Sequence, residues 1–200
     1  MNVFAKRAIV ALRGWVGPNW RDFRKERQPL VLCLALAIGL GAGIAAIGFR
    51  ELIGLAQWFW LGSRSEQTLT AAAGMPWWVI VAGPVVGGLV VGLLLQRISV
   101  RRAGGVADVI EARAFTGRKL GMADGLWSAL VSAISVGSGA SAGREGPIVH
   151  LGATLGGVIA RRAALPEWCR RTLLSAGVAS AVAASFNAPF AGVLFAHEVV

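Results

Sequence analysis

Charged residues are scarce in this sequence, and so are the side chains that carry most enzyme chemistry. Only 15% of the 200 residues are charged, whereas 56% are hydrophobic and the mean hydropathy is +0.64. A soluble domain of this length is rarely so apolar. The two cysteines, Cys33 and Cys169, make no disulfide or metal-binding pattern, and the two histidines form no nucleophile–base pair. The composition therefore argues against an enzyme and favours a membrane protein without metal or cofactor.

Acidic residues are outnumbered, with 10 Asp and Glu against 20 Lys and Arg, which gives a net charge of +10. Seven of the basic residues precede the first apolar run, as expected for a cytoplasmic N-terminus rather than for a nucleic-acid-binding surface. This stretch, residues 1–27, also contains Trp15 and Trp20. We expect it to lie at the cytoplasmic interface as an amphipathic segment, with a disordered tail as the alternative. It lacks the pattern of a secretory signal peptide.

Long uncharged runs identify the membrane spans. A spanning helix needs about 20 apolar residues, and three runs meet this length, the last one marginally: 28–49, 67–96 and 125–143. A fourth run, 172–196, is interrupted by Asn187-Ala-Pro189. We therefore expect an all-helical, multi-pass protein of the cell (inner) membrane, with tilted and partly broken helices.

The first two spans carry small residues at spacings that let helices approach closely. We expect the first span to cover 30–49 and to continue, tilted, to Trp60, with Trp58 and Trp60 at its outer interface. A polar outer loop over 61–76 then leads to a returning span over 77–96. The expected packing faces are Gly39, Gly41, Gly43, Ala45 and Ala46 in the first span and Gly83, Pro84, Gly87, Gly88 and Gly92 in the second.

The rest of the chain consists of apolar segments that are too short to cross a bilayer simply. They are expected to form helices over 104–114, 126–136, 148–160 and 168–185, with a last helix beginning at 193. Breaks rich in Gly or Pro separate them at 103–107, 137–147 and 185–189. Half-helices interrupted in this way are typical of sites at the middle of the bilayer, where positive helix N-termini point at an anion.

The break at 137–147 organises the chain. It sets Arg144 and Glu145 between two apolar runs, and a charge at the centre of a spanning helix costs roughly 2.5–3.5 kcal/mol on insertion scales. Pro147 suits the first turn of a helix, so Glu145 should lie at a helix N-terminus, which is an ion site. A glutamate that merely pairs with Arg144 is the alternative.

Nucleotide binding is excluded for the same segment. Gly137-Ser-Gly139-Ala-Ser-Ala142 formally fits a dinucleotide fingerprint. That motif needs an acidic residue about 20 positions further on and a surrounding strand–helix pattern, and both are missing. The Gly-Lys-Ser/Thr of a phosphate loop is also missing.

Two motifs resemble those of a known family. Gly143-Arg-Glu-Gly-Pro147, followed by Ile-Val-His-Leu-Gly152 and then by Ser185-Phe-Asn-Ala-Pro-Phe-Ala-Gly-Val-Leu-Phe195, is similar in order and spacing to the CLC family of chloride channels and chloride/proton antiporters. The resemblance covers residues 28–200, which correspond to the first of that family's two inverted halves. It implies a homodimer with one pore in each subunit, and bound chloride or another small anion. The chain stops inside an apolar helix, so we expect it to be part of a longer protein.

The resemblance makes Glu145 the external gate, which plugs the anion path until it swings away or is protonated. The anion-binding residues that it implies are Gly104, Gly105, Val106, Arg144, Glu145 and Gly146. The family's Gly-Ser-Gly-Ile-Pro motif is altered to Ala103-Gly-Gly-Val-Ala107, so Gly104 replaces a serine that helps to coordinate the central anion. The loss of that hydroxyl removes a hydrogen bond worth about 0.5–1.5 kcal/mol, which leaves the preferred anion open.

The family's internal proton-transfer glutamate falls on Val199, and the acid before it is retained as Glu198. Valine cannot carry a proton, so the resemblance favours a passive, gated chloride channel. One alternative is chloride/proton antiport, in which His197 could substitute. Another is a non-conducting fragment with an assembly or regulatory role.

The remaining polar residues are expected to be structural. His150 should pack one turn into the helix after the break, and Asn187 should help to satisfy backbone freed by Pro189. Two arginine pairs should cap and anchor helix ends, with the attraction of anions to a vestibule as the alternative. These pairs are Arg161-Arg162 and Arg170-Arg171.

Overall fold

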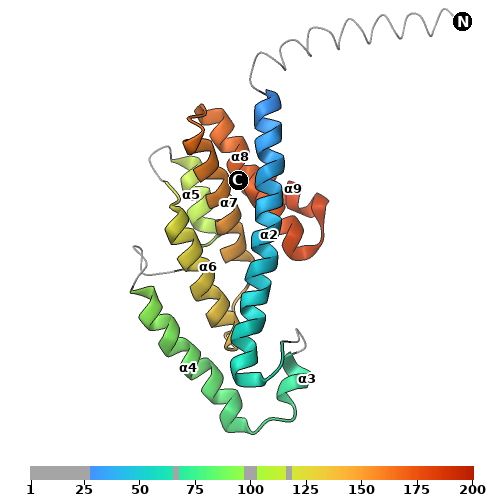
Figure 1. Cartoon of the computed structure of the whole chain (residues 1–200), viewed down its shortest axis with the longest axis vertical. Coiled ribbons are helices and arrows are strands. Elements are labelled where there is room, and N and C mark those ends of the chain that lie inside the picture. Colours follow the sequence, from blue (N-terminus) through green and yellow to red (C-terminus); the bar gives the residue numbers. More distant parts are fainter. Residues whose placement is uncertain (1–27, 65–67, 97–102, 116–118) are drawn as a thin grey trace, which may run out of the picture.

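The computed structural model describes residues 28–64, 68–96, 103–115 and 119–200, and every regular element within these ranges is an α-helix (Figure 1). The predicted interfacial segment 1–27 and the basic residues at 97–102 lie outside the described residues. In chain order the helices are α2 (Gln28–Leu61), α3 (Thr68–Ala72), α4 (Trp77–Leu95), α5 (Val106–Ala114), α6 (Met122–Gly137), α7 (Glu145–Arg162), α8 (Glu167–Phe186) and α9 (Pro189–Val199).

Two helices, α2 and α4, are long and apolar enough to cross a membrane. The 34 residues of α2 extend over about 51 Å at 1.5 Å per residue, which exceeds a hydrocarbon core of about 30 Å. The predicted continuation of the first span to Trp60 is therefore confirmed. Most of the apolar surface of both helices is exposed in this chain, including Leu36 and Leu40, as suits helices surrounded by lipid. The marginal third run forms α6, which has only 16 residues.

The centre of the fold is the pair α7 and α8, which contributes to all three clusters of buried apolar residues. Gly152 of α7 lies directly against the carbonyl of Gly177 in α8, and Gly156 lies against that of Leu173. A side chain at either position in α7 would collide with backbone, so glycine allows the two helices to pack at close range. This packing fixes the position of α7, which begins with Glu145.

The predicted packing faces are only partly correct. In α2, Gly39 approaches Ser180 of α8, where an added Cβ would lie 3.2 Å from the serine oxygen. In α4, only Gly83 and Gly87 are buried. Gly88 and Gly92 have open space where a side chain would project, because α4 contacts the rest of this chain along one narrow side near its N-terminal half.

Candidate functional site

Helix α7 begins with the glutamate singled out by the sequence. Pro147 lies in its first turn, where the missing N–H costs nothing, so the predicted placement of Glu145 at a helix N-terminus is confirmed. Its side chain is half-buried. The carboxylate lies over Gly143, where an added Cβ would be 2.6 Å from Oε2. The negatively charged carboxylate of Glu145 therefore lies against Gly143 in the preceding loop, next to the positive N-terminal end of α7.

The start of α5 comes from the altered motif at 103–107. The backbone N–H of Gly104 donates to Ser128 Oγ of α6 at 2.5 Å, and the N–H of Gly105 donates to Asp108 Oδ2 at 2.9 Å. Asp108 is 5% exposed and Ser128 1%. Two of the N–H groups that were expected to face an anion therefore donate to acceptors within the chain. The carboxylate of Asp108, in the first turn of α5, therefore already lies at this helix end.

The starts of α5 and α7 lie against each other. A Cβ added to Gly146 would lie 3.8 Å from the Cα of Gly105, and one added to Gly104 would lie 2.7 Å from the ring of His150. The predicted packing role of His150 is confirmed, since it is 5% exposed and covers Gly104. Val106 follows as the first residue of α5. The chain thereby brings two helix N-termini together through Gly105 and Gly146. Arg144 lies instead beside Arg50 and Ile53 of α2.

The loop before α7 is held by the end of α2. Trp60 Nε1 donates to the carbonyl oxygen of Gly137 at 2.7 Å, and the Trp60 ring packs on Gly83 of α4 and on Gly139. Gly139 has φ +99, which favours glycine. The prediction that Trp60 marks the outer interface was incomplete, because this residue joins α2, α4 and the loop. Trp58 remains 48% exposed.

The third break, at 185–189, is arranged differently. Asn187 ends α8 in the left-handed conformation, with φ 53, which is a structural role as expected. The neighbouring Phe186 and Phe190 are exposed. Figure 1 shows the turn between α8 and α9 on the opposite side of α2 from α5 and α6. The start of α9 is thus separated from the paired starts of α5 and α7 in this chain.

The end of α9 carries the residues that bear on proton transfer. Val199 is its last residue, half-buried, whereas His197 and Glu198 are exposed on its surface. Ala196 belongs to the buried apolar cluster that also includes residues of α5, α7 and α8. The two titratable side chains are therefore not enclosed by the described part of the chain.

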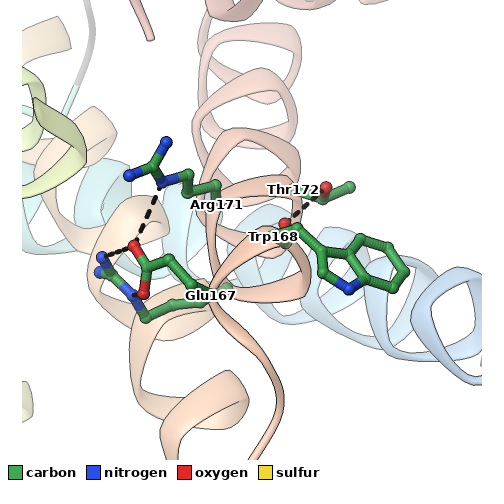
Figure 2. A network of polar contacts seen from close by, with 5 residues as sticks. Glu167, Trp168, Arg171 and Thr172 are labelled. Atoms are coloured by element: carbon green, nitrogen blue, oxygen red, sulfur yellow. Dashed lines mark hydrogen bonds and ion pairs between the residues drawn. The ribbon is translucent and has the colours of Figure 1, made fainter. Parts of the chain in front are cut away.

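Arg161 anchors the end of α7, as predicted, whereas Arg170 and Arg171 pair with Glu167 within their own helix. Arg161 Nη2 donates to the carbonyl oxygen of Leu120 at 2.6 Å and so ties the end of α7 to the start of the α6 segment. Figure 2 shows the Glu167 carboxylate between two guanidinium groups in the first turn of α8. The hydrogen bond from Arg170, with a second from Arg171, lowers the pKa of Glu167 from its ordinary value near 4.5 to about 2.

Sequence reasoning missed two residues at this site. Ser128 lies in an apolar helix, and its contact with Gly104 joins positions 24 apart in the chain. Trp60 bonds to a carbonyl 77 positions away. The helix contains two further serines, Ser132 and Ser135, so the sequence does not single out Ser128. Aromatic residues near a span end indicate an interface as readily as a tertiary contact.

Comparison with known proteins shows the family and the fold of this chain. A family model described as voltage gated chloride channel matches residues 87–200, more than half of the chain. A ClcB-like chloride channel protein of Ralstonia nicotianae is 37% identical over 175 residues, which are 85% of this chain and 41% of that protein. The voltage-gated ClC-type chloride channel ClcB of Escherichia coli K12 is 34% identical over 173 residues, 84% of this chain and 41% of that protein.

A crystal structure of a slow cyanobacterial Cl⁻/H⁺ antiporter shares the fold, with a TM-score of 0.67 and 24% sequence identity, over 84% of this chain and 40% of that one. The chain thus spans about two fifths of the length of the relatives that it matches. Both the family match and the all-helical fold agree with the resemblance carried by the two motifs. The chain belongs to the CLC family of voltage gated chloride channels and is part of an integral membrane protein.

Proposed function

We propose that the protein containing this chain is a passive, gated chloride channel in which Glu145 is the gate. The observation that supports this proposal is the position of Glu145 in the first turn of α7, beside the start of α5. Each helix N-terminus carries roughly +0.5 of a charge and N–H groups without helical partners. Two adjacent N-termini attract a small anion, and a carboxylate at the same place competes with it.

The two helix ends are not equivalent as anion sites. At α5 the N–H groups of Gly104 and Gly105 already donate to Ser128 and Asp108, and the buried Asp108 carboxylate offsets the helix dipole. An anion at α5 must therefore exchange those hydrogen bonds. We expect binding chiefly at Arg144, Glu145 and Gly146, and weak discrimination between chloride and other small anions at Gly104, Gly105 and Val106.

Passive conduction is favoured over proton-coupled antiport by the end of α9. Val199 cannot carry a proton, and the nearby His197 and Glu198 are exposed rather than enclosed next to the path. Antiport is the second candidate, because Glu198 remains one position from the expected acid. We further propose a homodimer in the cell (inner) membrane, with the N-terminus in the cytoplasm.

The gate is tested by chloride efflux from liposomes that contain the purified protein. Glu145→Gln should keep the path open, so that efflux no longer rises as the pH falls, whereas the unmodified protein should retain this dependence. Glu167→Gln is the matched control, since Glu167 is likewise the first residue of a helix but lies at the α7–α8 turn. The control should give the pH profile of the unmodified protein. The proposal fails if Glu145→Gln gives that same profile.

Coupling to protons is measured in the same liposomes. A chloride gradient should drive no proton uptake in a passive channel, and uptake against a proton gradient would establish antiport instead. The chain of residues 1–200 should be reconstituted beside the protein from the longest reading frame that contains it. Efflux from the longer protein alone would mean that the chain acts as one part of the pathway.

A further inference from the structure

A charged pocket of about 430 Å³ lies at the end of α2 that is far from the N-terminus. Its wall is formed by α2, by the segment that follows α2, by the end of α6, and by the residue before α7. The lining residues are Arg50, Glu51, Ile53, Gly54, Gln57, Arg64, Val136 and Arg144. We call this set the arginine pocket.

The charge of the arginine pocket suits an anion. Three guanidinium groups and one carboxylate give it a net charge of +2. The wall also includes the polar side chain of Gln57, which is 5% exposed. Arg50 stands 22 residues after Gln28 in a continuous helix, or about 33 Å along its axis. This distance matches the thickness of a hydrocarbon core, so we place the pocket near the membrane surface opposite to the N-terminus.

The arginine pocket adjoins the gate. Arg144 lines it and is the N-cap of α7, immediately before Glu145. A second pocket of about 40 Å³ shares Arg50, Ile53 and Arg144 with it and extends to Ser185 at the end of α8. Arg50 and Arg144 thus line both pockets, and Arg144 is the residue next to Glu145 in the chain.

We propose that the arginine pocket binds a small inorganic anion and raises its concentration at the outer side of Glu145. This inference rests on the proposed function, because it assigns the pocket to the path that Glu145 gates. A unit charge about 8 Å from an anion in water changes its local concentration roughly two-fold. This electrostatic attraction is stronger at low ionic strength, because the screening length is about 30 Å at about 0.01 M salt.

Binding can be measured without transport, through Trp58. The guanidinium carbon of Arg64 lies 5.7 Å from the centroid of the Trp58 ring, and Trp58 is 48% exposed. Iodide is a small anion that quenches tryptophan fluorescence on contact. The quenching assigned to Trp58 is the part that disappears in Trp58→Phe, measured on the purified protein in detergent at low ionic strength.

The variants have opposite expected signs. Arg50→Gln and Arg64→Gln should each reduce iodide quenching of Trp58 about two-fold, whereas Glu51→Gln should increase it by a similar factor. Arg162→Gln, which removes an arginine at the far end of α7, is the matched control and should leave it unchanged. Acrylamide, a neutral quencher, reports any change in exposure of Trp58 itself. Equal iodide quenching in all four variants, after correction by acrylamide, would overturn the proposal.

Transport separates this inference from the proposed function. Arg50→Gln should raise the half-saturating chloride concentration about two-fold at low ionic strength and leave the pH dependence of efflux intact. An unchanged pH profile in Glu145→Gln, together with the expected iodide responses of the arginine variants, would retain the pocket and reject the gate. Normal gating by Glu145 with no response of iodide quenching to the arginines would reject the pocket and retain the gate.

Discussion

Replacement of Gly137 by alanine should disturb the chain at the junction between α2, α6 and the loop that leads to Glu145. Gly137 is the last residue of α6 and is buried. A Cβ at this position would lie 2.5 Å from the Cβ of Ala56 and 2.7 Å from the carbonyl oxygen of Ile53. Both neighbours belong to α2, and the second is backbone, so rotation of a side chain cannot relieve the contact.

The size of the disturbance follows from these distances. Ordinary contact begins at 3.4 Å, so the end of α6 must move by about 0.7–0.9 Å away from α2. Overpacking of this kind typically costs about 1–3 kcal/mol. The shift also strains the bond from Trp60 to the Gly137 carbonyl, worth about 0.5–1.5 kcal/mol. We therefore expect Gly137→Ala to lower the free energy of unfolding by about 2 kcal/mol.

The assay is unfolding of the purified protein in mixed micelles with increasing SDS, followed by circular dichroism. Gly43→Ala is the matched control, because Gly43 lies within α2 and has nothing within 4 Å of an added Cβ. Alanine is favoured over glycine in a helix by about 1 kcal/mol, so the control should be neutral or stabilising. The same preparations should be tested for efflux, since the loop displaced by Gly137→Ala ends at Glu145.

A double variant tests the cause. Ala56→Gly removes the methyl group that is 2.5 Å from the added Cβ, so it should cost less in the Gly137→Ala background than alone, a coupling expected only for residues in contact. If Gly137→Ala unfolds at the same SDS concentration as Gly43→Ala, the α2–α6 contact is looser than the structure has it, and the reasoning is refuted.

Three further predictions concern the loop and the α7–α8 turn. Gly143→Ala should displace the Glu145 carboxylate, whose oxygen would be 2.6 Å from the new Cβ, so efflux should change in the direction of Glu145→Gln; an unchanged pH profile would contradict this. Trp60→Phe removes the hydrogen bond to Gly137 and should destabilise the fold by about 1 kcal/mol, whereas Trp58→Phe, which lacks that bond, should cost less. The lowered pKa of Glu167 means that its ion pairs stabilise the folded state fully above pH 4.5 and lose this effect as the pH falls toward 2. Because the carboxylate is exposed, Glu167→Gln should lower the free energy of unfolding by only about 0–1 kcal/mol at pH 7. The variant and the unmodified protein should become equally stable near pH 2. Equal stabilities at pH 7 with different stabilities at pH 2 would contradict this.

Local rules predicted the helices and the position of the gate candidate. The predicted first span with its continuation to Trp60 and the predicted span 77–96 agree with α2 and α4 within a few residues, and Pro147 indicated the start of α7. These signals are contained in short windows of sequence, because helix ends depend on neighbouring residues and spans depend on length and apolarity. The motifs at 143–152 and 185–195 also carried the family resemblance without any structure.

Contacts between segments that are distant in the chain could not be predicted from the sequence in the same way. The sequence of α4 offered five equivalent candidates for packing, and only Gly83 and Gly87 among them are buried. Trp60 was interpreted from its place at a span end, but it packs inward because Gly83, Gly137 and Gly139 leave room for its ring. Such a fit depends on three segments at once, and no single window contains it.

By itself the sequence determined that this is a helical membrane protein of the CLC family, with a glutamate at the start of a helix. Only the tertiary structure decided that the starts of α5 and α7 meet at Gly105 and Gly146. It also decided that Ser128 and Asp108 accept hydrogen bonds from backbone N–H groups at the start of α5. The physical reason is one of range. Hydrophobicity and helix-end chemistry act between neighbours in the chain, whereas the charge around an anion site is the sum over helix ends that folding alone brings together.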